Sequence, residues 1–181
     1  MKYFIVLLVT FLLINCKDEV FPKPAAQLKL EYPSATYSEF KADNFTFLTN
    51  QNAFVKSKNT VSKEIHYPKM KATVFLNYMP VANNIEALLT DAQKLTYDHV
   101  IKADQITEQP FLNFDNKVYG MFYEVGGNAA TNVQFYATDS TNNFMLGSLY
   151  FYAKPNYDSI LPAVDYIKKD IRKIIETLKW E

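Results

Sequence analysis

KVYGMFYEVGGNAATNVQFYAT, residues 117–138, is the stretch that decides the predicted fold of this chain. Two runs rich in aromatic and β-branched residues, 117–125 and 132–138, flank the turn residues Gly126, Gly127 and Asn128, which is typical of a β-hairpin. Alternate residues of the first run share one face, namely Tyr119, Met121, Tyr123 and Val125. Because Val118 and Phe122 are apolar on the other face, this run is predicted to be a central strand covered on both sides.

Strand patterns continue on both sides of this hairpin. Residues 105–111 and 144–153 predict its neighbours, since connections as short as 113–116 and 139–143 join antiparallel strands. Residues 70–78 predict a further strand that Pro80 stops, with one face formed by Ala72, Val74, Leu76 and Tyr78.

The sequence before residue 70 is less regular. Residues 28–32 alternate apolar and polar side chains, which indicates a half-buried strand ended by Pro33. The polar segment 34–63 contains only short apolar pieces at 45–48 and 53–55. It predicts two short strands or irregular cover.

Two amphipathic helices are predicted. The first covers 83–103, with Asn83 and Glu86 forming a capping box and an apolar stripe made of Ile85, Leu88, Leu89, Ala92, Leu95 and His99. The second begins at Asp158 or Ser159, tolerates Pro162 in its first turn, and has a stripe made of Ile160, Val164, Ile167, Ile171, Ile174 and Leu178. Its opposite face is basic, with Lys168, Lys169, Arg172, Lys173 and Lys179. That face is interpreted as the solvated side of the helix, or as a contact for anionic lipid or a partner.

The element order predicts an α+β fold, an antiparallel β-sheet with two main helices packed on it. It looks like the sandwich of the photosystem protein PsbP and the Ran-binding protein Mog1 (a PsbP/Mog1-like sandwich), an analogy of element order alone. Residues 28–181 are expected to form one globular domain.

The N-terminus resembles a bacterial lipoprotein signal. Lys2 precedes the apolar run 3–14, which is shorter than the ~20 residues that a membrane-spanning helix needs. The sole cysteine, Cys16, follows at once, and 13–16 reads Leu-Ile-Asn-Cys, similar to a lipobox. Cleavage is predicted between Asn15 and Cys16, although a smaller residue is usual at position 15. The alternatives are an ordinary signal peptide cut elsewhere, or a short buried segment.

Residues 1–15 are therefore expected to be a signal peptide, and residues 16–27 a lipidated cysteine and a flexible, proline-containing tether. Acyl chains such as palmitate on Cys16 would hold the domain at a lipid bilayer. Lys17, Asp18 and Glu19 resemble the surface-export signal of some Bacteroidetes lipoproteins, and the alternative is a solvated charge cluster in a linker. Export to the outer membrane is expected, with the periplasmic and the surface face both open.

Charge and cysteine content argue against a nucleic-acid-binding protein and against a disulfide-stabilised domain. Removal of the signal segment takes away Lys2, which leaves 18 basic residues against 19 acids, so no nucleic-acid footprint is indicated. An acylated Cys16 leaves no thiol for disulfides, so the domain must rely on its core, in which 13 Tyr and 14 Phe of the chain can take part.

No catalytic, metal-binding or cofactor-binding residue is assigned. His66 and His99, the two histidines, are far apart in sequence and are interpreted as packing residues. The strand-like run after Gly126 and Gly127 favours a turn over a phosphate cradle, which would need a helix start there. No Gly-x-Ser-x-Gly elbow is present, and the acids Asp91, Asp98, Asp104 and Glu108 are interpreted as solvated charges on helix faces or loop edges. Six tyrosines suggest an interface or a core: Tyr119, Tyr123, Tyr136, Tyr150, Tyr152 and Tyr157.

Several runs resemble the gliding-motility lipoprotein GldD family of Bacteroidetes-type bacteria. They are HYPKMKAT at 66–73, AQKLTY at 92–97 with HVIKAD at 99–104, VYGMFYEVGGNAA at 118–130, GSLYFYAKP at 147–155 and TLKW at 177–180. The segment 34–63 departs most, and 61–65 lacks a Cys-Trp pair that the family often has before its Tyr-Pro.

The resemblance implies a part in gliding motility and type IX secretion, without known catalysis. The first hypothesis is a non-enzymatic component or assembly factor of that envelope machinery, which acts through contacts with envelope proteins. The alternative is a periplasmic or surface ligand-binding lipoprotein with an aromatic pocket. A third is a hydrolase whose residues meet only in space.

Overall fold

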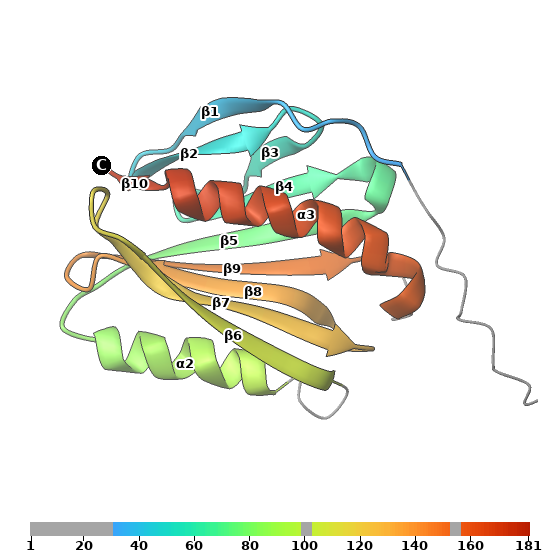
Figure 1. Cartoon of the computed structure of the whole chain (residues 1–181). Coiled ribbons are helices and arrows are strands. Elements are labelled where there is room, and N and C mark those ends of the chain that lie inside the picture. Colours follow the sequence, from blue (N-terminus) through green and yellow to red (C-terminus); the bar gives the residue numbers. More distant parts are fainter. Residues whose placement is uncertain (1–30, 99–102, 153–156) are drawn as a thin grey trace, which may run out of the picture.

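The computed structural model describes residues 31–98, 103–152 and 157–181, which form two antiparallel sheets and two α-helices (Figure 1). A three-stranded sheet has the order β1-β2-β10, and a seven-stranded sheet has the order β3-β4-β5-β9-β8-β7-β6. The smaller sheet consists of β1 (Tyr37–Lys41), β2 (Phe45–Asn50) and β10 (Lys179–Trp180). The larger one consists of β3 (Phe54–Ser57), β4 (Ser62–Tyr67), β5 (Ala72–Pro80), β6 (Ala103–Asn113), β7 (Val118–Gly127), β8 (Thr131–Thr138) and β9 (Asn143–Phe151). The helices are α2 (Ile85–Tyr97), α3 (Tyr157–Thr177) and the 3₁₀ turn η1 (Pro68–Met70). The predicted α+β class is confirmed.

The predicted antiparallel meander is confirmed in β6, β7, β8 and β9. Gly127 has a φ of 90° at the β7–β8 connection, so a glycine supplies the positive φ there. Phe122 and Tyr123 point to opposite faces of β7 and are each 2% exposed, so both faces are covered. Strand β7 is an inner strand as predicted, since it lies between β6 and β8, although β9 is the middle strand of the sheet.

The weakly predicted segment 34–63 contributes three complete strands and the first two residues of β4, rather than two strands. Strands β2 and β3 match the two apolar pieces, whereas β1 and β4 were missed because polar residues interrupt their apolar pattern. Strand β2 is no irregular cover, since Phe45 and Phe47 are fully buried and β10 pairs with it from the far end of the chain. Of the predicted strand 28–32, the described residues Glu31 and Tyr32 lie in no strand.

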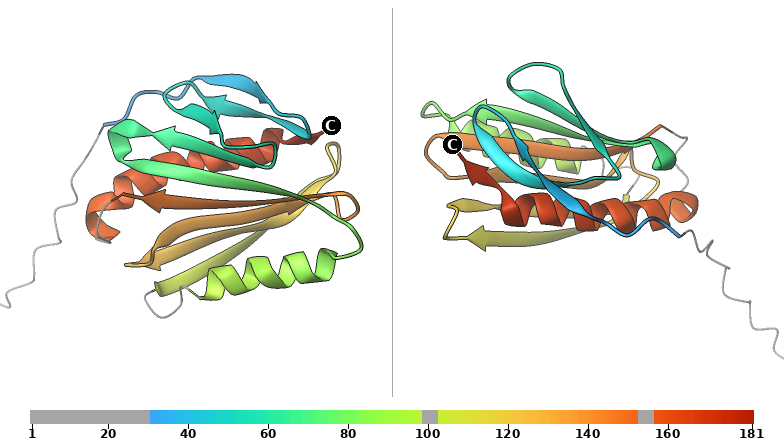
Figure 2. Two further views of the ribbon diagram at one scale, coloured as in Figure 1. Left: turned by 180° about the vertical axis from the view of Figure 1, so that it is seen from behind. Right: turned by 90° about the horizontal axis from the view of Figure 1, so that it is seen from above.

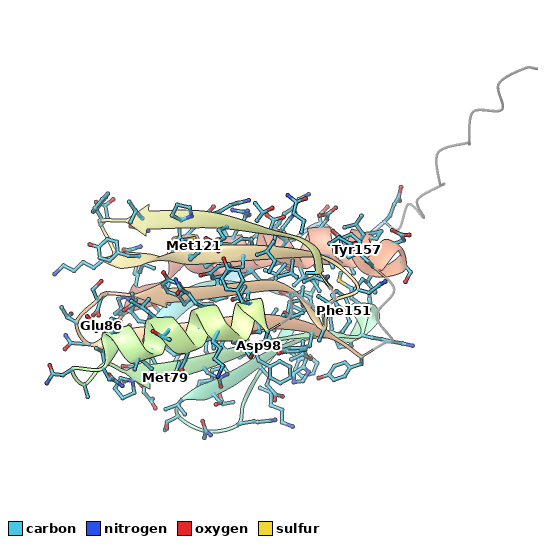
Figure 3. All side chains as sticks on the ribbon, turned by 90° about the horizontal axis from the view of Figure 1, so that it is seen from below. Met79, Glu86, Asp98, Met121, Phe151 and Tyr157 are labelled. Atoms are coloured by element: carbon cyan, nitrogen blue, oxygen red, sulfur yellow. The ribbon has the colours of Figure 1, made fainter. Side chains whose placement is uncertain are left out.

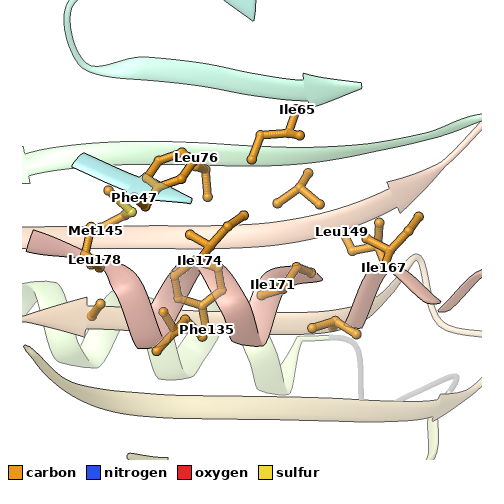
Figure 4. Packing of buried hydrophobic residues seen from close by; sticks show 14 of the residues in the cluster. Phe47, Ile65, Leu76, Phe135, Met145, Leu149, Ile167, Ile171, Ile174 and Leu178 are labelled. Atoms are coloured by element: carbon orange, nitrogen blue, oxygen red, sulfur yellow. The ribbon is translucent and has the colours of Figure 1, made fainter. Parts of the chain in front are cut away.

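Helix α3 packs its apolar stripe between the two sheets, and this forms the core (Figure 4). Five stripe residues are at most 5% exposed: Val164, Ile167, Ile171, Ile174 and Leu178. They meet the predicted apolar face of β5 and residues such as Phe135 and Leu149. Each such side chain contributes roughly 1.5–3 kcal/mol by leaving water. The helix begins one residue earlier than predicted, at Tyr157, so Pro162 lies beyond its first turn.

Helix α2 lies on the face of the larger sheet opposite α3 (Figure 2). Its apolar stripe is confirmed over the described residues. It is less buried than the stripe of α3: Ala92 and Thr96 are buried, whereas the leucines are half-buried. The predicted capping box is wrong. The N-cap is Asn84, whose side chain accepts a hydrogen bond from the N–H of Ala82 at 2.8 Å instead of capping the helix. The helix ends at Tyr97, earlier than predicted, and His99 lies outside the described residues.

Candidate functional site

The predicted anchor residues lie outside the described part of the chain. Asn15, Cys16 and the tripeptide Lys17, Asp18 and Glu19 all precede residue 31. Their roles in cleavage, lipidation and export therefore stay predictions. Within the ranges 31–98, 103–152 and 157–181, no helix is long and apolar enough to cross a membrane.

The chain that follows the tether is held against α3. The rings of Tyr32 and Tyr166 have centroids 5.2 Å apart, and the Tyr166 hydroxyl donates to the carbonyl of Pro33 at 2.9 Å. The amide of Asn52 donates to the carbonyl of Ser34 at 3.1 Å. The path of the chain into the domain is thus fixed along the first half of α3.

A buried carboxylate lies beside this entry point. Asp170 is 2% exposed and accepts hydrogen bonds from the Tyr37 hydroxyl and the Asn50 amide, each at 2.8 Å. Burial raises the pKa of Asp170, although these hydrogen bonds oppose the shift. The same burial, together with the hydrogen bond to Asp170, raises the pKa of Tyr37. Sequence reasoning missed this network, whose only signal was an acid placed inside the apolar stripe between Ile167 and Ile171.

The basic face of α3 is more than a solvated surface. Lys168 and Arg172 both contact Glu124 of β7 at 2.9 Å, and the guanidinium of Arg172 lies 4.3 Å from the centre of the Phe122 ring. Arg172 also donates to the side chain of Gln109. These contacts join α3 to the meander, so the two residues serve packing rather than free contact with lipid.

We expect Glu124→Gln to destabilise the domain by ~1 kcal/mol at neutral pH, because a partly exposed charge cluster contributes modestly. Burial opposes ionisation of Glu124, but the hydrogen bonds and charges of Lys168 and Arg172 prevail and lower its pKa. The stabilisation is therefore present above the unfolded pKa of about 4.3 and is lost as pH falls through the folded pKa. Urea unfolding at pH 7 and at pH 3 should show a larger difference from wild type at pH 7 than at pH 3. An equal difference at both would show that the charge is not involved.

An open groove lies between α2 and the larger sheet, on the face seen in Figure 3. It has a volume of roughly 500 Å³. Its lining is largely aromatic and aliphatic: Phe75, Leu95, Leu146, Tyr150 and Phe151, with Asn77, Ser148 and Tyr152 as the polar members. The rings of Phe75 and Tyr150 meet edge to face, with centroids 5.6 Å apart.

One end of the groove adjoins a hydrogen-bonded chain centred on His66. The imidazole Nε2 lies 3.0 Å from Glu64 Oε2, and Nδ1 lies 3.0 Å from Thr73 Oγ1. Thr73 Oγ1 in turn lies 2.9 Å from the hydroxyl of Tyr152, which lines the groove. The predicted packing role of His66 describes only part of what the residue does. Its ring stacks on Phe54, with centroids 4.9 Å apart. It also links the carboxylate of Glu64, through Thr73, to the hydroxyl of Tyr152 at the groove.

A buried amide lies next to the groove. Gln134 of β8 is 1% exposed and pairs in register with the groove residue Ser148. Neither its side-chain nitrogen nor its oxygen has a hydrogen-bond partner among the described residues. A polar group buried without a partner costs stability.

The remaining candidates from the sequence do not assemble into a site. Asp91, Asp98, Asp104 and Glu108 are exposed, and Asp104 and Glu108 lie on strand β6 rather than on a loop or helix. Among the described residues, no three His, Cys, Asp or Glu side chains are close enough to hold a metal ion. The tyrosines divide between core and surface, since Tyr123 is buried and Tyr152 is 62% exposed.

A second apolar surface lies at the tip of the β6–β7 hairpin. Leu112 is 65% exposed and Phe114 is 72% exposed. They adjoin a groove of roughly 390 Å³ that Ile175 and Glu176 of α3 complete. We call Leu112 and Phe114 the hairpin patch.

Fold and surfaces together describe an α+β domain with a closed hydrophobic core that presents two open apolar surfaces to solvent. The chain belongs to the gliding motility lipoprotein GldD family, whose model matches residues 17–180. Among curated proteins, none gives a significant match. Family membership makes the chain a lipid-anchored protein of the cell envelope with a role in gliding motility.

Proposed function

We propose that this protein is a component or assembly factor of the gliding and type IX secretion machinery that acts through protein contacts, anchored by acyl chains on Cys16. The hairpin patch carries the proposal. Leu112 and Phe114 are the two most exposed large apolar side chains among the described residues, and neighbouring exposed apolar side chains are a feature of protein interaction sites. The closed core is consistent with a contact role as well.

The position of the hairpin patch suits a contact away from the anchoring membrane. The side chain of Asn113 donates to the carbonyl of Glu176, and Trp180 donates to the carbonyl of Lys117, so the tip is held at the C-terminal end of α3. Pro33, near the start of the described chain, is held by Tyr166 near the middle of the same 21-residue helix. Tyr166 and Glu176 lie ten residues apart, which is ~15 Å along a helix, so the patch is displaced from the point where the described chain joins the domain.

We expect the double variant Leu112→Ser, Phe114→Ser to abolish gliding and secretion while leaving the domain folded. Both side chains are exposed, so the free energy of unfolding should change by no more than ~0.5 kcal/mol. The measurements are colony spreading, secretion of a reporter, and thermal unfolding of the purified variant. Val61→Ser, at an exposed apolar residue outside the patch, is the matched control. Normal gliding by the double variant at normal abundance would refute the role of the patch.

One observation favours a second candidate, a ligand-binding lipoprotein. The groove beside α2 combines aromatic walls with a few polar side chains, as small-molecule sites do. Its open shape argues for a ligand that is only partly enclosed.

We also propose that the lipid lies in the outer membrane. If Lys17, Asp18 and Glu19 act as an export signal, the domain faces the cell surface, and if they are only linker charges, it faces the periplasm. Protease treatment of intact cells separates the two outcomes.

A further inference from the structure

The direction of the hydrogen bonds along the His66 chain follows from its carboxylate end. Glu64 is paired with Lys58 at 2.5 Å, and the hydrogen bond from Lys58 lowers the pKa of Glu64. An ionised carboxylate has no proton to donate. The Nε2 of His66 must therefore carry the hydrogen in the contact with Glu64.

This assignment extends to the groove. In a neutral imidazole with its proton on Nε2, Nδ1 accepts, so the hydroxyl of Thr73 donates to it. Thr73 Oγ1 then receives the hydroxyl proton of Tyr152. The phenol oxygen of Tyr152 thus offers lone pairs to the groove and has no proton left to give.

From this polarity we propose that the groove beside α2 binds an aromatic side chain of a partner protein that carries an N–H donor, as tryptophan does. The indole ring would pack against Phe75, Leu146 and Tyr150, and its N–H would donate to the hydroxyl oxygen of Tyr152. The inference rests on the proposed function, which supplies a protein partner. Tryptophan in a desolvated pocket is also a common anchor of protein interfaces.

The lining disfavours charged occupants. Among the described residues, none of the side chains that line the groove is charged. Lys58, the nearest cation named on the His66 chain, is already paired with Glu64. A phosphate or carboxylate would therefore be desolvated without a counter-charge, whereas a neutral aromatic donor meets both the walls and the acceptor.

Protonation of His66 would reverse the chain. An imidazolium donates from Nδ1 to Thr73, which then donates to Tyr152, so the Tyr152 hydroxyl turns its proton toward the groove. The groups that face His66 are Glu64 of β4, Lys58 after β3, the Phe54 ring of β3, Thr73 of β5 and the phenol of Tyr152. A protonated His66 would therefore weaken the preference for an N–H ligand.

The test uses the mature lipoprotein in lipid nanodiscs and ligand-observed NMR. The probes are N-acetyl-tryptophanamide and its 1-methylindole analogue, which has the same ring but no N–H. At pH ~8 we expect the first probe to bind ~3- to 10-fold more tightly, the effect of one hydrogen bond. Tyr152→Phe keeps the ring of an exposed residue, so it should fold and bind the two probes equally. Tyr97→Phe, an exposed tyrosine of α2 that does not line the groove, should keep the preference.

Three results would overturn the inference: neither probe binds, the preference persists in Tyr152→Phe, or free indole binds more tightly than the amide, which indicates a small-molecule site. Photo-crosslinking in cells separates this inference from the proposed function. A benzophenone amino acid in place of Tyr152 should give adducts at a tryptophan-containing segment of an envelope protein. Adducts from position 112 but not from 152 would overturn the groove assignment alone, and adducts from neither position would count against the proposed function.

Discussion

A form of this protein without the Cys16 lipid is expected to fold, to be shed from membranes, and to leave cells unable to glide. Each buried CH₂ of an acyl chain contributes ~0.8 kcal/mol to membrane binding. Stable attachment needs at least two membrane-binding elements, such as two acyl chains. Loss of the thiol removes every acyl chain at once. The membrane-bound fraction should fall from nearly all of the protein to nearly none.

The experiment needs a cleavable leader, because an uncut signal segment would itself hold the protein at the inner membrane. The Cys16→Ala chain is therefore exported behind an ordinary signal peptide, and its abundance, fractionation and colony spreading are measured. Asn15→Gly is the matched control, since it brings the lipobox closer to the usual pattern and should keep both lipid and motility. Full motility of the shed form would contradict the anchored role.

We expect Asp170→Ala to destabilise the domain by ~3 kcal/mol, which is a large effect for a single substitution. The change removes the acceptor of the partly buried Tyr37 hydroxyl and one of the two acceptors of the buried Asn50 amide, which keeps its contact with Tyr166. A buried polar group without its acceptor costs about 1–3 kcal/mol. Urea unfolding followed by the fluorescence of Trp180, the sole tryptophan, measures the loss. Asp165→Asn, at an exposed acid on the same helix, should change stability by less than ~0.5 kcal/mol.

The pH dependence of Asp170→Asn tests the cause. Burial raises the pKa of Asp170 in the folded state, so its contribution is fully present below the unfolded pKa of about 3.9 and is lost as pH rises through the folded pKa. The stability of wild type relative to Asp170→Asn should therefore fall between pH ~4 and neutral pH. A relative stability that rises over this range would contradict a raised pKa.

Regular periodicity explains what the sequence predicted well. The α3 stripe and the β6–β9 meander repeat apolar residues at helix or strand spacing over many residues, so local pattern and final burial agree. Strand β4, SKEIHY, has no such signal. Its Lys63 is buried only because the carbonyls of Asn59 and Thr60 accept from its amine, and Glu64 only because Lys58 pairs with it. Such contacts cannot be read from spacing.

The candidate site was missed for a related reason. Glu64, His66, Thr73 and Tyr152 come from three separate parts of the chain, and only the pairing of β4, β5 and β9 brings them together. No short motif could therefore reveal them. The direction of the hydrogen bonds at the groove follows only from the register of these strands together with the ionised state of Glu64.

The pairing of β10 with β2 has a consequence for biogenesis. Trp180 lies opposite Phe45, so the first sheet of the domain is completed by residues that are synthesised long after β2. Contacts between such distant parts of a chain form late and slowly. During translocation that proceeds from the N-terminus, the smaller sheet would stay incomplete until β10 has crossed. Until then β2 would present an open edge on the side that β10 later covers.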